Sequence, residues 1–354
     1  MMISFIYQGL PARVIFGVGK LKELPAEVDL LGLRRVLVLC TPYQRADAEK
    51  IAALLGARSV GLYDQATMHV PIALAEQARA HVKQLNVDGL VTVGGGSTTG
   101  LAKAIAMTTG LPTVAVPTTY AGSEMTPIWG LTVGAEKTTG RDVKILPRTV
   151  IYDPTLTVSM PAMLSATSGM NAIAHCVEAL YAENANPIMS LMAEEGIRAL
   201  GASLPRIMKQ PGDLEARSEA LYGAWLGGSV LGAVGMALHH KLCHVLGGTF
   251  NLPHAEVHTV VLPHATAYNA KAAPEAMRRI ARALDTKDAA GGLYDLEAAL
   301  GTPLTLAALG MQPADLDRAA DLAVKNPYFN PRPITREGIR ALLEEAFTGR
   351  RPGA

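Results

Sequence analysis

The sequence carries almost no excess of charge of either sign, since 32 Lys and Arg residues stand against 31 Asp and Glu residues, for a net charge of +1. A protein that binds nucleic acid through its overall field needs a strongly basic balance, and this balance excludes that class. Local positive charge around a site can still attract an anionic substrate. With 49% apolar and only 18% charged residues, the chain is expected to be globular, with a small molecule as its partner.

Cysteine is also scarce, with three residues, Cys40, Cys176 and Cys243, that are far apart and form no CxxC pair. Each lies in an apolar stretch, which favours buried thiols in a reducing compartment over disulfides or a zinc cluster. The first residues lack the basic stretch and the following apolar stretch of a secretory signal. These absences together predict a cytoplasmic protein.

Charged residues are absent between Ala220 and Leu238, a stretch long enough to suggest a membrane span. This stretch is rich in Gly and Ala, contains Tyr222 and Ser229, and runs directly into the polar residues 239–241. A buried core helix explains this composition better, and its small side chains predict close packing by other helices. We therefore expect no membrane segment.

The first part of the chain alternates short β-rich runs with helical runs. Strands are predicted at 36–39, 59–63, 89–93, 113–116 and 143–152, and helices at 46–55, 72–85 and 98–109. Strands that alternate with helices of this length imply βαβ units and a parallel sheet. The pattern predicts a Rossmann-like α/β domain of the dinucleotide-binding kind.

The character of the sequence changes from about Pro161 onward, where helical periodicity dominates and β-branched runs are few. A chain of 354 residues is long enough for two hydrophobic cores. We therefore predict an α/β domain over residues 1–155 followed by an all-helical domain over residues 156–354.

A glycine-rich segment, Gly94, Gly95, Gly96 and Ser97, follows one predicted strand and opens a predicted helix. Glycines let the backbone approach an anion closely, and the N–H groups at a helix start carry partial positive charge. The segment is not the GxGxxG fingerprint, and by itself it is equally compatible with a tight turn. A second segment, from Pro117 to Glu124, follows the next strand and is also rich in Gly and hydroxyl groups. Because loops at the carboxyl ends of neighbouring parallel strands form ligand sites, the two segments together favour phosphate binding.

The histidines of the second part are spaced in a way that predicts a polar cavity. His240 and His244 are four residues apart and share one face of a helix, as do Asn171 and His175 in an otherwise apolar helix. His254 follows Pro253 at a point where a new helix can begin. Polar groups buried without partners cost desolvation energy, so these side chains are expected to line a cavity. Since His239, His258 and His264 lack such pairing, a structural role is the default for them.

Three imidazoles could bind zinc or iron, but the fourth ligand is not the expected carboxylate. Asn171 stands where an Asp would complete a set of three His and one Asp. A neutral amide oxygen is a poor substitute, and the affinity for a divalent ion should fall.

These segments resemble the iron-containing alcohol dehydrogenase superfamily over nearly the whole chain. The resemblance is carried, in order, by VIFGVGKLKELP, GGGSTTGLAKA, PTTYAGSEMT, SGMNAIAHCVEALYA, LHHKLCHVLGGTFNLPH and NPRPIT. Gly100 and Asn171 stand where the superfamily usually has Asp. This combination is similar to the maleylacetate reductases, whose members are understood to need no metal.

The resemblance implies roles for individual residues. His175, His240 and His254 correspond to three metal ligands of the iron enzymes and would form a vestigial site, while His244 corresponds to a histidine near the nicotinamide. Gly94 to Ser97 would hold the pyrophosphate, with Thr118 and Thr119 beside the cofactor. The implied reaction is the NAD(P)H-dependent reduction of the C=C bond of maleylacetate to 3-oxoadipate in the breakdown of aromatic compounds, by a homodimer. His244 and His254 are then expected to polarise the ketone and donate the proton, with His175 and His240 shaping the pocket.

The cofactor and the substrate each raise a question of charge. NAD sites commonly place an acid at a strand end to bind the ribose 2′-OH, whereas this chain has Thr41 there and Arg45 close by. We therefore expect NADH as the first choice, with NADPH also accepted. The two carboxylates of the substrate need cations, for which Lys103, Arg141 and Arg332 are candidates, with Asn171 as a further contact.

Two other readings of the sequence stay open. A metal-dependent alcohol dehydrogenase of the same superfamily would complete its ion site with Asn171 or water. A sugar-phosphate cyclase, a lyase that uses NAD transiently, would share the scaffold but needs a richer set of Lys, Arg and Glu residues in its site.

Overall fold

The computed structural model describes residues 5, 7–10, 12–134, 136–326 and 328–353, and the chain divides into two compact units. One unit spans Gly9–Met160 and the other contains Pro161–Ala354, grouped with the first eight residues. The predicted boundary at residue 155 falls inside η6 (Pro154–Thr157), a 3-10 turn that stays with the first unit. The side chain of Asp153 begins this turn and also accepts hydrogen bonds from the backbone N–H groups of Gly19 and Leu21.

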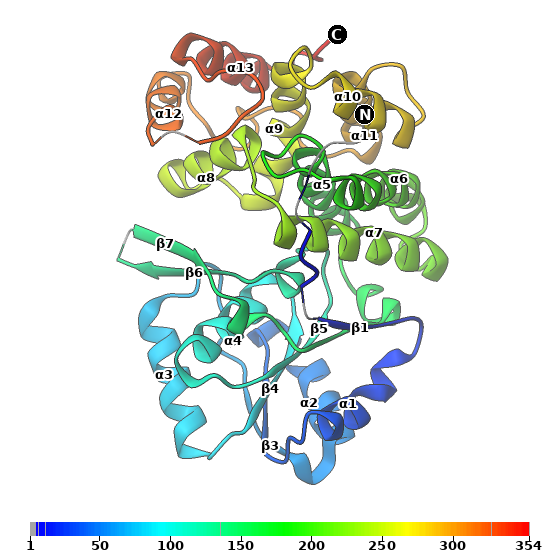
Figure 1. The fold of residues 1–354 in the computed structure, drawn as a ribbon, viewed down its shortest axis with the longest axis vertical. Helices are drawn as coiled ribbons and strands as arrows, with labels where there is room; N and C mark the ends of the chain where they lie inside the picture. The colour runs from blue at the N-terminus through cyan, green and yellow to red at the C-terminus, as the bar shows by residue number, and fades with distance from the viewer. Residues whose placement is uncertain (1–4, 6, 11, 135, 327, 354) are drawn as a thin grey trace. The chain divides into compact units, whose positions relative to one another are not determined.

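The first unit is built on a six-stranded parallel sheet, drawn in Figure 1, with the strand order β1-β8-β5-β4-β2-β3. The strands are β1 (Arg13–Phe16), β2 (Val36–Leu39), β3 (Ser59–Tyr63), β4 (Gly89–Gly94), β5 (Thr113–Pro117) and β8 (Thr149–Tyr152). Every neighbouring pair is parallel. The predicted α/β fold class is thereby confirmed.

Helices cover both faces of this sheet because its central strands are apolar on both sides. Val36 and Val38 of β2 pack with α1 (Leu24–Leu30) and α2 (Arg45–Leu55) in one core. Leu37 and Leu39 pack on the other face with α3 (Ile72–Gln84) and α4 (Gly96–Thr109). The alternation follows from the two-residue period of a strand, and a strand buried on both faces reads as a continuous apolar run.

One predicted strand is partly wrong. Residues 143–152 were expected to be a single strand, but the structure has a 3-10 turn, η5 (Val143–Ile145), before β8 begins at Thr149. The Asp142 side chain accepts a hydrogen bond from the backbone N–H of Lys144 and starts this turn. Pro147 then has no N–H to offer to a sheet. The strand β1 and the antiparallel hairpin β6 (Ile128–Val133) and β7 (Glu136–Arg141) were not predicted.

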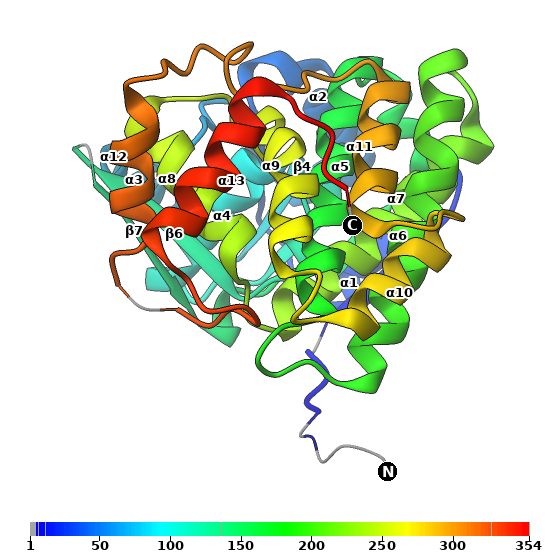
Figure 2. The ribbon, with the colours of Figure 1, turned by 90° about the horizontal axis from the view of Figure 1, so that it is seen from above.

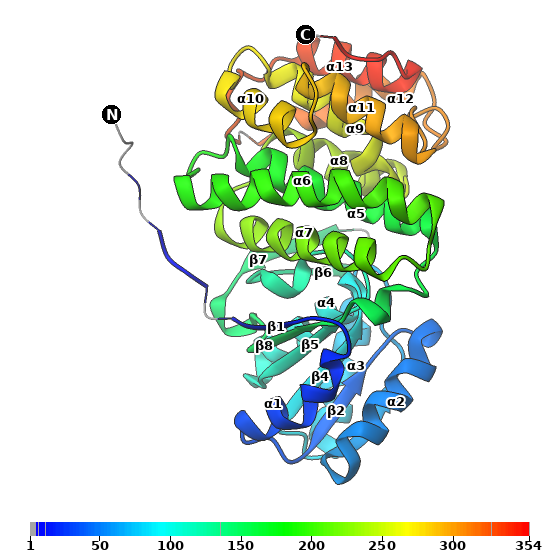
Figure 3. The ribbon, with the colours of Figure 1, turned by 90° about the vertical axis from the view of Figure 1, so that its right-hand side faces the viewer.

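The second unit is helical throughout its named elements. They are α5 (Ala162–Ala179), α6 (Pro187–Lys209), α7 (Leu214–Ala233), α8 (Leu238–Phe250), α9 (His254–Asn269), α10 (Pro274–Ala283), α11 (Ala289–Leu300), α12 (Asp315–Ala323) and α13 (Arg336–Thr348). Figure 3 shows α5, α6 and α7 lying side by side. Figure 2 shows α12 and α13 beside α8 and α9, with which they form one apolar core.

The uncharged stretch from Ala220 to Leu238 lies mostly in α7 and is largely buried, as its composition predicts. A Cβ on Gly223 would approach Leu200 Cγ of α6 to 2.7 Å, and one on Gly227 would approach the Ala172 carbonyl of α5 to 2.9 Å. The small side chains therefore allow the close helix packing that the sequence suggests. Among the described residues no single helix is long and apolar enough to cross a membrane, and the pair α7 and α8, which passes by length and composition, is bent by 96°.

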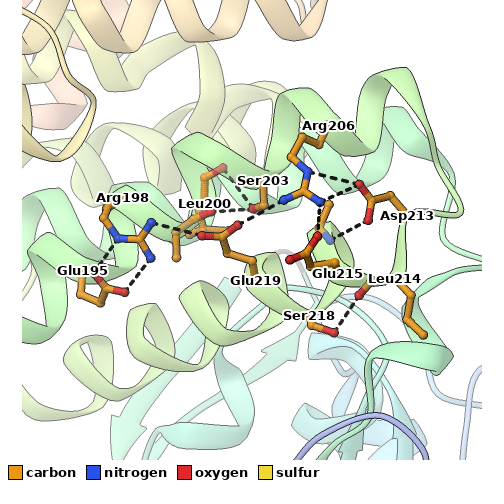
Figure 4. A network of polar contacts seen from close by, with 12 residues as sticks. Glu195, Arg198, Leu200, Ser203, Arg206, Asp213, Leu214, Glu215, Ser218 and Glu219 are labelled. Atoms are coloured by element: carbon orange, nitrogen blue, oxygen red, sulfur yellow. Dashed lines mark hydrogen bonds and ion pairs between the residues drawn. The ribbon is translucent and has the colours of Figure 1, made fainter.

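Ion pairs join the outer faces of α6 and α7, as Figure 4 shows. Arg198 of α6 reaches Glu219 of α7 at 3.1 Å and Glu195 on its own helix at 2.8 Å. Arg206 reaches Asp213 and Glu215 at 3.0 and 2.8 Å. Because these side chains are partly or largely exposed to solvent, each pair is worth about 1 kcal/mol or less.

Candidate active site

The glycine segment forms a bend that no larger residue fits. Gly94 ends β4 with φ of +146°, and a Cβ on it would lie 2.4 Å from Thr98 Oγ1 and 2.6 Å from Gln44 Oε1. A Cβ on Gly95 would lie 2.7 Å from Thr119 Oγ1. The helix α4 begins at Gly96, and no side chain caps its first turn. Uncapped N–H groups at the start of a 14-residue helix suit a phosphate group.

The second loop lies against the first. The backbone N–H of Thr118 donates to the Gly94 carbonyl at 3.0 Å, so the ends of the neighbouring strands β4 and β5 are tied together. Gln44 Nε2 donates to Thr118 Oγ1 at 2.6 Å, and Thr41 Oγ1 donates to Gln44 Oε1 at 3.0 Å. The structure thus gathers the predicted cofactor residues, Gly94 to Ser97, Thr118, Thr119 and Thr41, at the carboxyl ends of β2, β4 and β5. Sequence reasoning missed Gln44, which bridges two of them.

The basic residue near Thr41 is already engaged. Arg45 pairs with Glu49 at 3.0 Å and with Asp64 at 2.5 Å, and Asp64 directly follows β3. The Arg45 guanidinium therefore faces two carboxylates in this structure, and a cofactor phosphate would have to compete with them.

Lys103 is buried inside the first unit and holds the second loop. Its ammonium group donates to the Ser123 carbonyl at 2.6 Å, to Thr126 Oγ1 at 2.9 Å and to the Ile128 carbonyl at 2.8 Å. Burial lowers the pKa of Lys103 to about 7, an effect that the nearby Glu124 carboxylate partly offsets. Three N–H bonds of an ammonium are matched by these three acceptors, so the geometry gives Lys103 a structural role rather than contact with a substrate carboxylate.

The other two candidate cations lie in different units. Arg141 is the last residue of β7 in the first unit and is exposed. Arg332 belongs to the second unit, where its guanidinium lies 4.0 Å from the centre of the Tyr268 ring and donates to the Tyr268 carbonyl at 3.2 Å. These contacts fix the Arg332 side chain on α9 and leave its other N–H groups at the surface.

The second unit brings the predicted histidines together. His175 of α5 and His240 of α8 are stacked with ring centres 5.1 Å apart, and His244 lies one helical turn beyond His240 at 6.3 Å. His254 is the first residue of α9, as the preceding Pro253 predicts. His175, His240 and Asn171 are buried, whereas His244 and His254 are exposed. The cluster therefore has a buried floor and an accessible edge.

Several polar atoms of the floor have no hydrogen-bond partner among the described residues. These atoms are Asn171 Oδ1, His175 Nδ1 and His240 Nε2. Leaving a buried polar atom unpaired costs about 1–3 kcal/mol, so these three atoms are suited to accept hydrogen bonds from, or donate them to, a bound ligand or water. Burial lowers the pKa of His175 well below its usual value, and the neighbouring His240 and His254 lower it further. His175 is therefore neutral near pH 7.

A buried carboxylate that sequence reasoning missed orients the cluster. Glu178 Oε2 lies 2.7 Å from His240 Nδ1, and the two Glu178 oxygens also accept the backbone N–H groups of Ala237 and His239 at 2.9 and 2.7 Å. An acceptor of two backbone N–H groups is best matched by an N–H on His240 Nδ1. Nε2 of a neutral His240 then carries a lone pair. The signal was present, since Glu178 is three residues after His175 and faces the same side of α5.

Two histidines with no predicted site role also belong to the cluster. The ring centre of His258 lies 4.4 Å from that of His254 and 5.0 Å from that of His240. His239 Nε2 and His258 Nδ1 lie 3.0 Å apart and share a hydrogen bond. Burial lowers the pKa of both rings well below the usual value. The pair His254 and His258 is four residues apart on α9 and could have been predicted from that spacing, whereas only the fold could show the contacts of His258 with His239 and His240.

The residues that correspond to an iron site do not fit a divalent ion well. In the part of the chain that the structure describes, one trio of potential ligands lies within 4.8 Å of one another, and it is His239, Cys243 and His258, not His175, His240 and His254. The fourth position holds the neutral amide of Asn171 instead of a carboxylate. Both observations argue against a tightly held ion in the predicted vestigial site.

Comparison with known proteins identifies the family. Residues 11–154 match the family model described as iron-containing alcohol dehydrogenase, and residues 165–347 match the model of the C-terminal part of the Fe-containing alcohol dehydrogenase family. The chain is 59% identical to maleylacetate reductase from Burkholderia cepacia over 99% of this chain and 100% of the relative, and 57% identical to that of Sphingobium indicum over 99% of each. The crystal structure of maleylacetate reductase from Agrobacterium tumefaciens superposes with a TM-score of 0.97 at 51% identity, covering 99% of this chain and all of that one.

The chain belongs to the maleylacetate reductases of the iron-containing alcohol dehydrogenase family.

Membership in the maleylacetate reductases confirms the predicted family, the fold class and the enzyme class, an NAD(P)-dependent oxidoreductase. It also argues against the alternative of a sugar-phosphate cyclase, because the relatives that are 59% and 57% identical over 99% of this chain are maleylacetate reductases.

Proposed function

We propose that this maleylacetate reductase uses NADH, and also NADPH, to reduce the C=C bond of maleylacetate to 3-oxoadipate without a required metal ion. The observation that carries the metal-free part is the histidine cluster, which has an amide where the iron enzymes have a carboxylate and whose three expected ligands are not among the groups with ligand atoms within 4.8 Å of one another in the described part of the chain. The substrate is inferred from the relatives.

The chemistry makes modest demands on such a site. A hydride from NAD(P)H adds to the alkene carbon β to the ketone, the electron pair of the C=C bond moves toward the ketone oxygen, and a proton then joins the α carbon. Charge develops on an enolate oxygen, which is less basic than a full alkoxide. Oriented N–H donors can stabilise an enolate in a site that excludes water.

The residues divide these tasks by exposure. His244 and His254, at the accessible edge, are the groups that donate to the ketone oxygen and supply the proton. The buried His175 is neutral near pH 7 and shapes the floor. Glu178 holds His240 through Nδ1, which fixes the direction in which Nε2 points. Arg141 and Arg332 remain the candidates for the substrate carboxylates, and Asn171 for a polar contact.

The dual use of cofactors is supported by the end of β2. Thr41 offers no carboxylate that would repel a 2′-phosphate. Arg45 is paired with Glu49 and Asp64, so it would have to leave these carboxylates to bind a 2′-phosphate. NADH is therefore the first choice. Equal kcat/KM values for the two cofactors would contradict this preference, and no turnover with NADPH would contradict dual use.

A metal-dependent alcohol dehydrogenase is the second candidate, and one observation favours it. A carboxylate that holds one ring nitrogen of a histidine, with the other left bare, is the usual outer arrangement of a metal ligand. Glu178 and His240 have this arrangement. If an ion is bound here, His240 Nε2 would be its ligand.

One experiment separates the two candidates. NADH oxidation is followed with maleylacetate before and after treatment with a chelator, and metal content is measured in the same samples. We expect activity within about twofold of the untreated enzyme. Loss of activity that only iron or zinc restores, together with alcohol oxidation, would establish the second candidate. The variant Asn171→Asp should raise the affinity for a divalent ion at least tenfold.

We also propose that the enzyme works as a homodimer in the reducing cytoplasm, without nucleic-acid or membrane partners. The compartment is supported by three buried cysteines that form no disulfide in the structure. Light scattering tests the dimer, and a monomeric mass would contradict it.

A further inference from the structure

Two histidines of the cluster, His239 and His258, lie close to the thiol of Cys243 and form with it a group that could hold a metal ion. His239 and Cys243 are four residues apart on one face of α8, and His258 comes from the adjacent helix α9. All three side chains are at most 1% exposed. Their ligand atoms lie within 4.8 Å of one another.

The distances are close to those of a zinc site. His239 Nε2 lies 3.0 Å from His258 Nδ1 and 3.6 Å from Cys243 Sγ. Bond lengths of about 2.05 Å to nitrogen and 2.3 Å to sulfur place two nitrogens of a tetrahedral ion ~3.3 Å apart, and a nitrogen and a sulfur ~3.6 Å apart. Movement of the rings by a few tenths of an ångström would therefore admit the ion. Three protein ligands leave one position of a tetrahedral ion for an exchangeable group.

The local charges suit a divalent cation. The Glu178 carboxylate is fully buried and acts electrostatically on Cys243. A Cys243 thiolate and this carboxylate carry two negative charges together, which match one divalent ion. A thiol binds such an ion as a thiolate and must lose its proton to do so. One proton leaves when the ion binds, and each neutral histidine keeps its proton on the other ring nitrogen.

We propose that His239, Cys243 and His258 form a binding site for a thiophilic divalent cation of the zinc class. The site is distinct from the vestigial position at His175, His240 and His254, because it shares no residue with it and has a sulfur ligand. The proposal does not depend on the proposed function. An ion here would leave the unshared nitrogen of His258, Nε2, as a fixed N–H donor beside His240 and His254.

The test uses Co²⁺ as a coloured substitute for Zn²⁺, added to the full-length protein that has been freed of metal. A cobalt–thiolate bond gives a strong absorption band in the near ultraviolet, which histidine and carboxylate ligands do not give. We expect this band at one ion per chain, with Zn²⁺ displacing the cobalt. The band should be absent in Cys243→Ser and reduced at least tenfold in apparent affinity in His258→Asn.

Two control variants make the result specific. Cys176→Ser removes another buried thiol, whose sulfur faces Gly196 of α6, and should keep the band. His254→Asn removes a ligand of the vestigial position and should also keep it. Melting curves confirm that each variant is folded, and should Cys243→Ser fail to fold, Cys243→Ala replaces it. No near-ultraviolet band, or a band that survives loss of Cys243, would overturn the proposal, as would binding that is lost only in His254→Asn.

Discussion

The two polar regions of this molecule differ in how their polar groups are satisfied. In the first unit, Lys103, Thr118 and Gln44 all have hydrogen-bond partners within the protein. In the second unit, Asn171 Oδ1, His175 Nδ1 and His240 Nε2 are buried and have none among the described residues. The contacts of Lys103, Thr118 and Gln44 make the first region a largely satisfied scaffold that presents backbone N–H groups, although Thr98 Oγ1 is also buried there without a partner among the described residues. The second region has buried polar atoms that a bound ligand could pair with. Substitutions should therefore have different consequences in the two regions.

The sharpest test of this difference is at the accessible edge of the histidine cluster. His244→Ala should lower kcat about 1000-fold, because general acid or electrostatic assistance by one side chain contributes factors of about 10²–10⁴. The affinity for NADH should stay within about twofold. Steady-state kinetics and a fluorescence titration with NADH measure the two effects. An equal loss of both would assign His244 a structural role.

The scaffold should instead fail at the cofactor. Gly94→Ala introduces a Cβ that overlaps Thr98 Oγ1 and Gln44 Oε1 at a φ of +146°. We expect NADH binding to weaken about 100-fold, since the loop must move away from the phosphate position. Gly110→Ala is a useful comparison, because a Cβ there meets nothing within 4 Å although φ is +70°. If Gly94→Ala binds NADH as tightly as Gly110→Ala does, the glycine loop is not the cofactor site.

Glu178 tests how far the histidine cluster depends on the buried carboxylate that holds His240. Glu178→Gln keeps the shape but replaces one acceptor with an NH₂ group that faces a backbone N–H of α8. We expect kcat/KM for maleylacetate to fall about 10- to 100-fold with NADH binding unchanged. Nitrogen NMR of labelled histidine should show a weaker hydrogen bond at His240 Nδ1, because an amide oxygen is a weaker acceptor than a carboxylate. Glu183→Gln, an exposed acid that follows α5, serves as the control and should leave both readouts unchanged.

The smallest effect is expected from the pH dependence of the buried lysine. The folded-state pKa of Lys103 is lowered from 10.5 to about 7, so the unfolded chain holds more protons between these values. Stability from this residue therefore rises with pH from about 7 upward, by about 1.5 kcal/mol between pH 7 and 8.5. Urea denaturation of the wild type and Lys103→Met should show this rise in the wild type alone. A pH-independent difference between the two proteins would argue against it.

What the sequence predicts well is local. The β2 and β3 strands are short apolar runs with clear boundaries, and the start of α9 follows from Pro253. The pairs Asn171 with His175 and His240 with His244 share helical faces, and ring contacts join His175, His240 and His244 in the fold. Such features depend on neighbours within one helix or strand.

What the sequence did not predict depends on distant contacts. His258 of α9 shares a hydrogen bond with His239 of α8, and Glu178 of α5 accepts a hydrogen bond from the backbone N–H of His239 in the first turn of α8. The burial of Lys103 depends on Ser123, Thr126 and Ile128, which a loop and a hairpin bring to it. From sequence alone, a charged residue in a helix is predicted to be exposed, because the acceptors that would allow its burial are not known.

The order of the strands has a consequence for synthesis on the ribosome. β1 pairs with β8, so Arg13 cannot pair until Thr149 has been synthesised. In the same way, the backbone N–H groups of Gly19 and Leu21 have no acceptor until Asp153 has been synthesised. An emerging chain can assemble the β2, β3, β4 and β5 portion early, but its first strand has no place in the sheet until most of the unit has been made. Contacts between such distant residues slow folding, and an edge left open in the meantime can pair wrongly with another chain. Translation that pauses before residue 153 should therefore leave this protein in its most aggregation-prone state.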